Sequence, residues 1–129
     1  MPGRIPLDTN IVIALFAGEK PVRERLAECP EVFLPSTVLG ELYYGVLKSS
    51  QAGANFARIE ELAAAVTILP CDATTARLYG EIKASLRLKG RPIPENDIWI
   101  AAVAQQYGLS LATRDEHFNH VAGLAAEAW

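Results

Sequence analysis

The strongest constraint on the fold is the alternation of short apolar segments with longer segments of helical periodicity along the chain. The short segments predict strands at residues 4–7, 32–34, 67–69 and 109–112. The longer ones predict helices at residues 10–16, 21–29, 36–47, 55–66, 73–88 and 95–107. Strands that alternate with helices are typical of an α/β domain, in which helices cover both faces of a mainly parallel sheet. We therefore expect a three-layer α/β fold.

Helix boundaries follow from capping and stop residues. Thr9 or Asn10 is the expected N-cap of the first helix, and Asp72 is the expected N-cap of the fifth. Gly108 is the expected stop of the last helix. The tail at residues 121–129 fits either a final short strand or a helical turn.

The composition is that of one soluble globular domain over residues 1–129, because half of the residues are hydrophobic and 21% are charged. No apolar run approaches the roughly 20 residues that span a bilayer, and the N-terminus lacks a signal peptide's apolar stretch. We therefore expect a cytoplasmic protein without a membrane partner. Cys29 and Cys71 are expected to be buried, reduced thiols.

The net charge of −3 argues at first against a nucleic-acid partner. A basic segment departs from this average, since residues 83–91 contain no acid and carry four cations, Lys83, Arg87, Lys89 and Arg91. Such a segment is either a solvated helix end or a site for phosphates, and the sequence leaves both interpretations open.

Four acidic residues stand where packing alone does not explain them. Asp8 and Asp115 each follow a predicted strand, and ligands of parallel sheets bind beyond the carboxyl ends of the strands. Glu41 interrupts an apolar helical stripe, and Asp97 begins a helix that is apolar nearly all round. A buried carboxylate is costly unless it is neutralised, paired or bound to a metal. If the fold brings the four together, they predict a site for a divalent cation.

Each acid also has a purely structural interpretation. Asp8 and Asp97 could serve as helix-terminal acids, although Asn96 could cap the last helix instead. Glu41 could pair with an arginine or lie at a helix margin, and Asp115 could simply favour a turn.

The histidines add little to the expected site. His117 and His120 are interpreted as surface or packing residues, because the chain lacks the Cys/His spacing of zinc sites. Hard cations such as Mg²⁺ prefer oxygen ligands, which the four acids supply.

Taken together in this order, the motifs resemble PIN-domain proteins of the VapC-like toxin type. The matching stretches are LDTN (7–10), PSTVLGELYYGV (35–46), IPENDIWIAAVAQQYGLSLATRDEHF (93–118) and GL (123–124). The resemblance covers essentially the whole chain. It places Asp8, Glu41, Asp97 and Asp115 on the family's acidic metal site, and Asn10 and Thr113 on supporting polar positions. Some members carry another polar residue at the fourth acid, so the set is complete here.

The resemblance implies a PIN-like three-layer domain and an endoribonuclease that depends on Mg²⁺, for which Mn²⁺ can substitute. It also implies a cognate antitoxin protein, whose C-terminal segment packs into a groove near the acids, and a homodimer. Physical reasoning adds a hypothesis for RNA, in which the basic segment and Arg114 hold the backbone while Tyr43 or Tyr44 stacks on a base.

Two rival functions remain open. A catalytically silent module of the same fold would bind RNA or protein without cleaving it. A phosphatase with an aspartyl nucleophile is less favoured, because Asp8-Thr9-Asn10 lacks the second acid that such enzymes use two residues on.

Overall fold

The computed structural model describes residues 3–50 and 52–129. The elements follow in chain order as β1 (Arg4–Pro6), α1 (Thr9–Phe16), α2 (Lys20–Ala27), β2 (Glu31–Pro35), α3 (Ser36–Leu47), α4 (Ala52–Ala65), β3 (Thr67–Leu69), α5 (Ala73–Leu88), α6 (Glu95–Gln106), β4 (Leu111–Thr113), the 3₁₀ helix η1 (Glu116–His120) and β5 (Ala126–Ala128). The alternation of strands and helices confirms the predicted α/β class.

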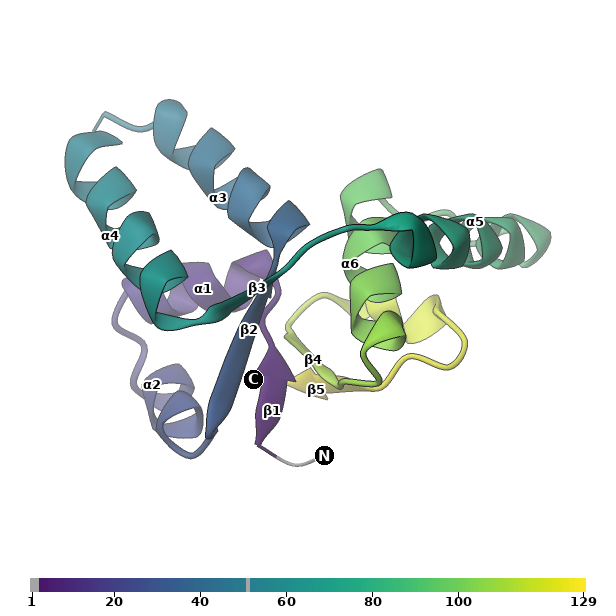
Figure 1. Ribbon diagram of the computed structural model, residues 1–129, viewed down its shortest axis with the longest axis horizontal. Helices are drawn as coiled ribbons and strands as arrows, with labels where there is room; N and C mark the ends of the chain where they lie inside the picture. Colours follow the sequence, from purple (N-terminus) through teal and green to yellow (C-terminus); the bar gives the residue numbers. More distant parts are fainter. Residues whose placement is uncertain (1–2, 51) are drawn as a thin grey trace.

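All described strand pairs are parallel. One sheet has the order β1-β2-β3, with Ile5 opposite Val32 and Leu34 opposite Ile68, and β4 pairs with β5. A parallel bridge between Leu7 and Ala112 links β1 to β4 and so joins the two groups of strands. In Figure 1, helices α1 to α4 lie on one side of these strands, and α5 and α6 lie on the other.

The core forms on both sides of the sheet because β2 alternates its side chains. Phe33 is buried with Val103 of α6 and Leu109, while the next residue, Leu34, belongs to the larger cluster that includes Val38. Helix α6 is buried along most of its length, as its apolar sequence predicts. Glu95 and Asn96 at the start of α6 are exposed, whereas Asp97 in the same turn is buried.

The C-terminal third differs from the sequence-based expectation. Strand β4 begins at Leu111, not at residue 109, because the backbone amide of Leu109 still bonds to the carbonyl of Ala104 in the turn that ends α6. Gly108 makes this turn with a φ of 65°, a conformation that favours glycine. The tail forms a strand, β5, and η1 is an element that the sequence did not predict.

The structure decides between the capping residues that the sequence left open. The N-cap of α1 is Asp8 and not Thr9 or Asn10; its side chain accepts a hydrogen bond from the backbone amide of Thr9, which lies inside the helix. Helix α6 starts directly after Pro94 with no side-chain cap from Asn96. Asp72 does cap α5, as predicted.

Both cysteines are free thiols, but Cys71 is exposed and Cys29 is half-buried, so the prediction of buried thiols is wrong for Cys71. Tyr43 packs against Phe56, whereas Tyr44 is exposed. None of the helices in the described part of the chain is both long and apolar enough to cross a bilayer.

Candidate active site

The ends of β1 and β4 bring two predicted site residues into contact. The backbone amide of Asp8 bonds to the carbonyl of Ala112 (2.9 Å), which holds the two strand ends side by side. The hydroxyl of Thr113 donates to Oδ2 of Asp8 (2.7 Å), and the amide of Thr9 donates to Oδ1 (2.8 Å). Asp8 is only 4% exposed, so these two donors stabilise a carboxylate that water hardly reaches.

Asp115 is positioned by the same hydroxyl. Its backbone amide donates to Oγ1 of Thr113 (2.9 Å), and its carboxylate caps η1 by accepting from the backbone amide of His117 (2.9 Å). Asn10 supports this turn, because its Oδ1 accepts a hydrogen bond from the backbone amide of Arg114 (3.3 Å). Both polar positions that the sequence singled out therefore hold the end of β4 in place.

Glu41 enters the site from α3. It accepts hydrogen bonds from the hydroxyl of Thr9 (2.6 Å) and from the side-chain amide of Asn96 (3.4 Å), which connects α3 to α1 and α6. In the described part of the chain its hydrogen-bond partners are thus a hydroxyl and an amide rather than the arginine that a purely structural role would suggest.

Asp97 lies in the first turn of α6, and its side chain is 12% exposed. Burial, together with the charges of Asp8, Asp115 and Glu41, raises its pKa to about 6 against a smaller opposing effect of His117. Burial also raises the pKa of Asp8, to which Glu41 and Asp115 add, while Thr113 and the amide of Thr9 oppose the shift. The four carboxylates therefore share one electrostatic environment.

The chemistry of these donors fits a divalent cation. One ligand atom each from Asp97, Asp115 and His117 lies within 4.8 Å of the other two. Asp8 is next to this group, and each of its oxygens keeps a lone pair beyond the hydrogen bond that it already accepts. Carboxylates that raise one another's pKa are stabilised when a cation is held between them.

His117 lies beside two of these acids. Its side chain is half-exposed, which agrees with the surface position expected from the sequence, but its Nδ1 lies 3.0 Å from Asp115 and 3.3 Å from Asp97. The signal that could have found it is the spacing of two residues from Asp115, which places a capping acid and a side chain of the first turn close together. That signal has meaning only if η1 is predicted.

Most of the basic residues singled out in the sequence form ion pairs or hydrogen bonds within the protein. Lys83 pairs with Glu95, the ammonium group of Lys89 donates to the carbonyl of His120, and Arg114 forms a two-pronged pair with Glu19. Arg87 and Arg91 are exposed. These contacts give Arg114 a structural partner where the sequence suggested RNA.

Comparison with known proteins decides the family. A profile described as PIN domain matches residues 5–124. The chain belongs to the PIN domain family. Ribonuclease VapC2 of Haemophilus influenzae is 38% identical over 126 residues, which cover 95% of this chain and 96% of that protein. The tRNA(fMet)-specific endonuclease VapC of Shigella flexneri is 36% identical with the same coverage.

Solved structures give the same assignment. The DNA-bound VapBC of Salmonella typhimurium superposes on this PIN domain with a TM-score of 0.91 at 30% identity, covering 98% of each chain. VapBC2 of Rickettsia felis, bound to a promoter fragment, gives a TM-score of 0.89 at 30% identity and covers 97% of this chain and 98% of that chain. The predicted PIN-like fold is confirmed.

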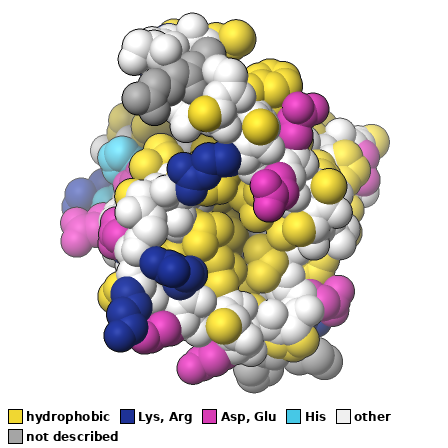
Figure 2. All heavy atoms as spheres, turned by 90° about the vertical axis from the view of Figure 1, so that its left-hand side faces the viewer, with side chains coloured by type: hydrophobic (Ala, Val, Ile, Leu, Met, Phe, Trp, Pro, Cys, Tyr) yellow, Lys and Arg dark blue, Asp and Glu magenta, His cyan; other side chains and the backbone are white. Residues whose placement is uncertain are grey.

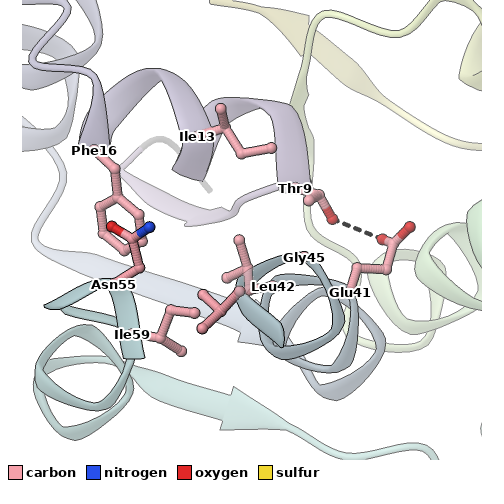
Figure 3. Close-up of a pocket in the computed structure, with 9 residues that line it drawn as sticks. Thr9, Ile13, Phe16, Glu41, Leu42, Gly45, Asn55 and Ile59 are labelled. Atoms are coloured by element: carbon pink, nitrogen blue, oxygen red, sulfur yellow. Dashed lines mark hydrogen bonds between the residues drawn. The ribbon is translucent and has the colours of Figure 1, made fainter. Parts of the chain in front are cut away.

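A groove of about 300 Å³ opens beside the acids of this PIN domain. It is lined by Thr9, Ile13, Phe16, Glu41, Leu42, Gly45, Val46, Asn55 and Ile59 of helices α1, α3 and α4. On this face of the molecule, hydrophobic side chains gather in a hollow with charged groups around it (Figure 2). The close-up shows the hydrogen bond between Thr9 and Glu41 at one end and apolar side chains such as Ile59 and Phe16 at the other (Figure 3). The groove is therefore acidic at one end and mainly apolar along the rest, where Asn55 adds an amide.

Proposed function

We propose that the protein is a metal-dependent endoribonuclease that acts as the toxin of a toxin–antitoxin pair. The observation that carries this proposal is the meeting of four carboxylates from four separate segments, where burial, and after it the charges of the neighbouring acids, raise the pKa of Asp8 and Asp97. Ribonuclease activity in the names of the curated relatives supports the same chemistry. A site that served packing alone would not gather like charges at one edge of the sheet.

We assign the acids to a Mg²⁺ site for which Mn²⁺ can substitute. Asp8, Asp97 and Asp115 supply direct or water-mediated ligands, and Glu41 completes the site or takes a proton from the attacking water. When bound, such a cation lowers the pKa of water and neutralises charge on phosphate oxygens.

The surrounding polar groups orient the acids for this chemistry. Thr113 holds Asp8 through its hydroxyl and Asp115 through the backbone, and Asn10 fixes the turn between them. Thr9 holds Glu41 at the rim of the site, where the carboxylate is half-buried.

The deciding experiment uses the protein purified without any partner and incubated with RNA. Cleavage should require Mg²⁺ or Mn²⁺, stop in excess EDTA, and be abolished by Asp8→Asn and by Asp97→Asn. Glu60→Gln, which removes an exposed acid of α4, is the matched control and should leave cleavage unchanged.

Two results would contradict the assignment. Full activity of both aspartate variants, or equal activity in EDTA, would show that the acids do not carry the reaction. Binding of RNA without cleavage across several metals would favour the silent binding module instead.

We further propose that an antitoxin segment occupies the groove between α1, α3 and α4. The solved relatives include VapBC complexes, which contain a partner protein. The groove suits a helix or extended segment with apolar side chains along its length and a basic residue where it meets Glu41. Such a segment would cover the rim of the acidic site and so block RNA.

The homodimer and the cytoplasmic location remain proposals. A dimer would be recognised by the mass of the purified protein in multi-angle light scattering, and fractionation of expressing cells would test the location.

A further inference from the structure

We propose that His117 is a nitrogen ligand of the cation, beside Asp97 and Asp115, and that it biases the site toward borderline cations such as Mn²⁺ over Mg²⁺. This inference rests on the metal-dependent function proposed above and adds a residue and a selectivity to it.

The position of the imidazole is the first argument. Nδ1 of His117 lies 3.0 Å from Oδ1 of Asp115 and 3.3 Å from Oδ2 of Asp97, so a single ring nitrogen contacts carboxylates from two different segments. A ring nitrogen carries at most one hydrogen, which cannot bond both oxygens fully. A cation shared by the three atoms would satisfy all of them at once.

The separations are the second argument. In octahedral coordination with bonds of about 2.1 Å, adjacent ligand atoms lie about 3 Å apart. The two distances from Nδ1 are close to this value, and one ligand atom of each of the three residues lies within 4.8 Å of the others. The side chains therefore need little rearrangement to act as neighbouring ligands.

The local backbone explains why the ring is held there. Asp115 caps η1 by accepting from the backbone amide of His117 (2.9 Å), and Phe118 anchors η1 in the core at 1% exposure. The side chain of His117 is half-exposed, so the ring does not contribute to the core itself. His120 of the same short helix interacts differently, since its backbone carbonyl accepts a hydrogen bond from Lys89.

The type of ligand determines the expected selectivity. Carboxylates and water suit Mg²⁺ and Mn²⁺, whereas imidazole binds later divalent metals better and Mg²⁺ poorly. One nitrogen among oxygens should therefore raise the affinity for Mn²⁺ and Co²⁺ relative to Mg²⁺ without excluding Mg²⁺.

The test measures metal binding in the absence of RNA. Metal-free wild type, His117→Ala and the matched control His120→Ala are titrated with Mn²⁺, and binding is followed by loss of the electron paramagnetic resonance signal of free Mn²⁺. Electron spin-echo modulation then reports whether a nitrogen nucleus is bound directly to Mn²⁺. Competition with Mg²⁺ gives the selectivity, and circular dichroism verifies that each variant is folded.

We expect nitrogen coupling in wild type and in His120→Ala, and none in His117→Ala. Affinity for Mn²⁺ should fall about tenfold in His117→Ala, the lower end of what losing even an indirect contact to a metal ligand costs, and affinity for Mg²⁺ should change much less. Binding of Mn²⁺ by wild type without nitrogen coupling, or coupling that survives in folded His117→Ala, would overturn this inference alone. Failure of wild type to bind any divalent cation would overturn the proposed function as well.

Discussion

Thr113 shows how much of the site depends on one hydroxyl group. It donates to Asp8 and accepts from the backbone of Asp115, so it couples the acids that follow β1 and β4. It also opposes the effect of burial on the pKa of Asp8. We expect Thr113→Val, which keeps the shape of the side chain, to lower cleavage by about 10–100-fold while the protein stays folded.

Thr113→Ser is the matched control, because it retains the hydroxyl and should stay near wild-type activity. Initial cleavage rates of the three proteins at saturating metal provide the measurement. Equal rates for the valine and serine variants would mean that the hydroxyl does not organise the acids.

The raised pKa of Asp97 predicts how stability depends on pH. Between about pH 4 and pH 6, the folded state binds more protons at this group than the unfolded state does, so metal-free protein loses stability as pH rises through that window. Below about pH 4 the ionisation of Asp97 does not destabilise the folded state, and above about pH 6 the destabilisation is complete. This destabilisation is at most about 3 kcal/mol of unfolding free energy, since the pKa of Asp97 in the folded state is roughly two above its ordinary value.

We therefore expect Asp97→Asn to be more stable than wild type at pH 7.5 in EDTA. With metal present, the variant should not cleave RNA. Urea unfolding at pH 4.5 and pH 7.5 measures the difference, which should shrink at the lower pH. Added Mn²⁺ should stabilise wild type more than the variant. The same pH dependence in both proteins would contradict the assignment of the shift to this group.

Among the elements, α1 has two separate tasks. Its N-terminal end carries Asp8 as cap and Thr9 as the partner of Glu41, while Ile13 and Phe16 line the groove. Ile13 is 58% exposed, so replacing it should not disturb the core. We expect Ile13→Ser to leave cleavage intact and to weaken antitoxin binding about tenfold, which corresponds to about 1.4 kcal/mol.

Leu88→Ser is the control for this prediction, because Leu88 is 90% exposed and lies outside the groove. Isothermal titration of each variant with the partner's C-terminal peptide provides the affinities. A loss that is equal in both variants would point to a general surface effect and not to the groove.

The elements that could be predicted from the sequence are those with strong periodicity or with clear capping and stop residues. Helix α6 followed from its apolar residues and Gly108, and the start of α5 followed from its cap, Asp72. Element η1 was missed, because five residues of 3₁₀ helix have no periodicity to detect and depend on Asp115 as a cap.

The acids of the candidate site could be predicted from the sequence, whereas the hydrogen bonds and contacts between them mostly could not. Asp8 and Asp115 could be placed together because parallel strands end at the same edge of a sheet. The cap of α1 could not be chosen in advance, since Asp8, Thr9 and Asn10 are all good capping residues on sequence alone. The contact of His117 with Asp97 could not be predicted, because these two residues come together only through the tertiary fold.

At the scale of the whole molecule, Arg114 connects three distant segments. Its guanidinium bonds both carboxylate oxygens of Glu19, between α1 and α2, and donates to the carbonyl of Trp129 (2.8 Å). Because Arg114 stands between Thr113 and Asp115 in the sequence, these contacts also hold the backbone of the site in place. We expect Arg114→Gln to lower the melting temperature by a few degrees and to lower kcat, without a selective rise in KM for RNA.

Arg114→Lys should not rescue this loss, because an ammonium group cannot reproduce the two parallel bonds. Arg87→Gln, which removes an exposed arginine of α5, is the control and should leave the melting temperature unchanged. Differential scanning fluorimetry and steady-state kinetics measure both effects. A higher KM with an unchanged melting temperature would restore the interpretation that Arg114 binds RNA.

The bridge between Leu7 and Ala112 has a consequence for how the protein is made. The hydrogen bond from Thr113 to Asp8 joins residues 105 positions apart. It can therefore form only after nearly the whole chain has been synthesised. Contacts this distant form late in folding. A nascent chain on the ribosome that ends before β4 holds Asp8, Glu41 and Asp97 but lacks Thr113 and Asp115. A chain of this topology therefore lacks two residues of the candidate site until synthesis is almost complete.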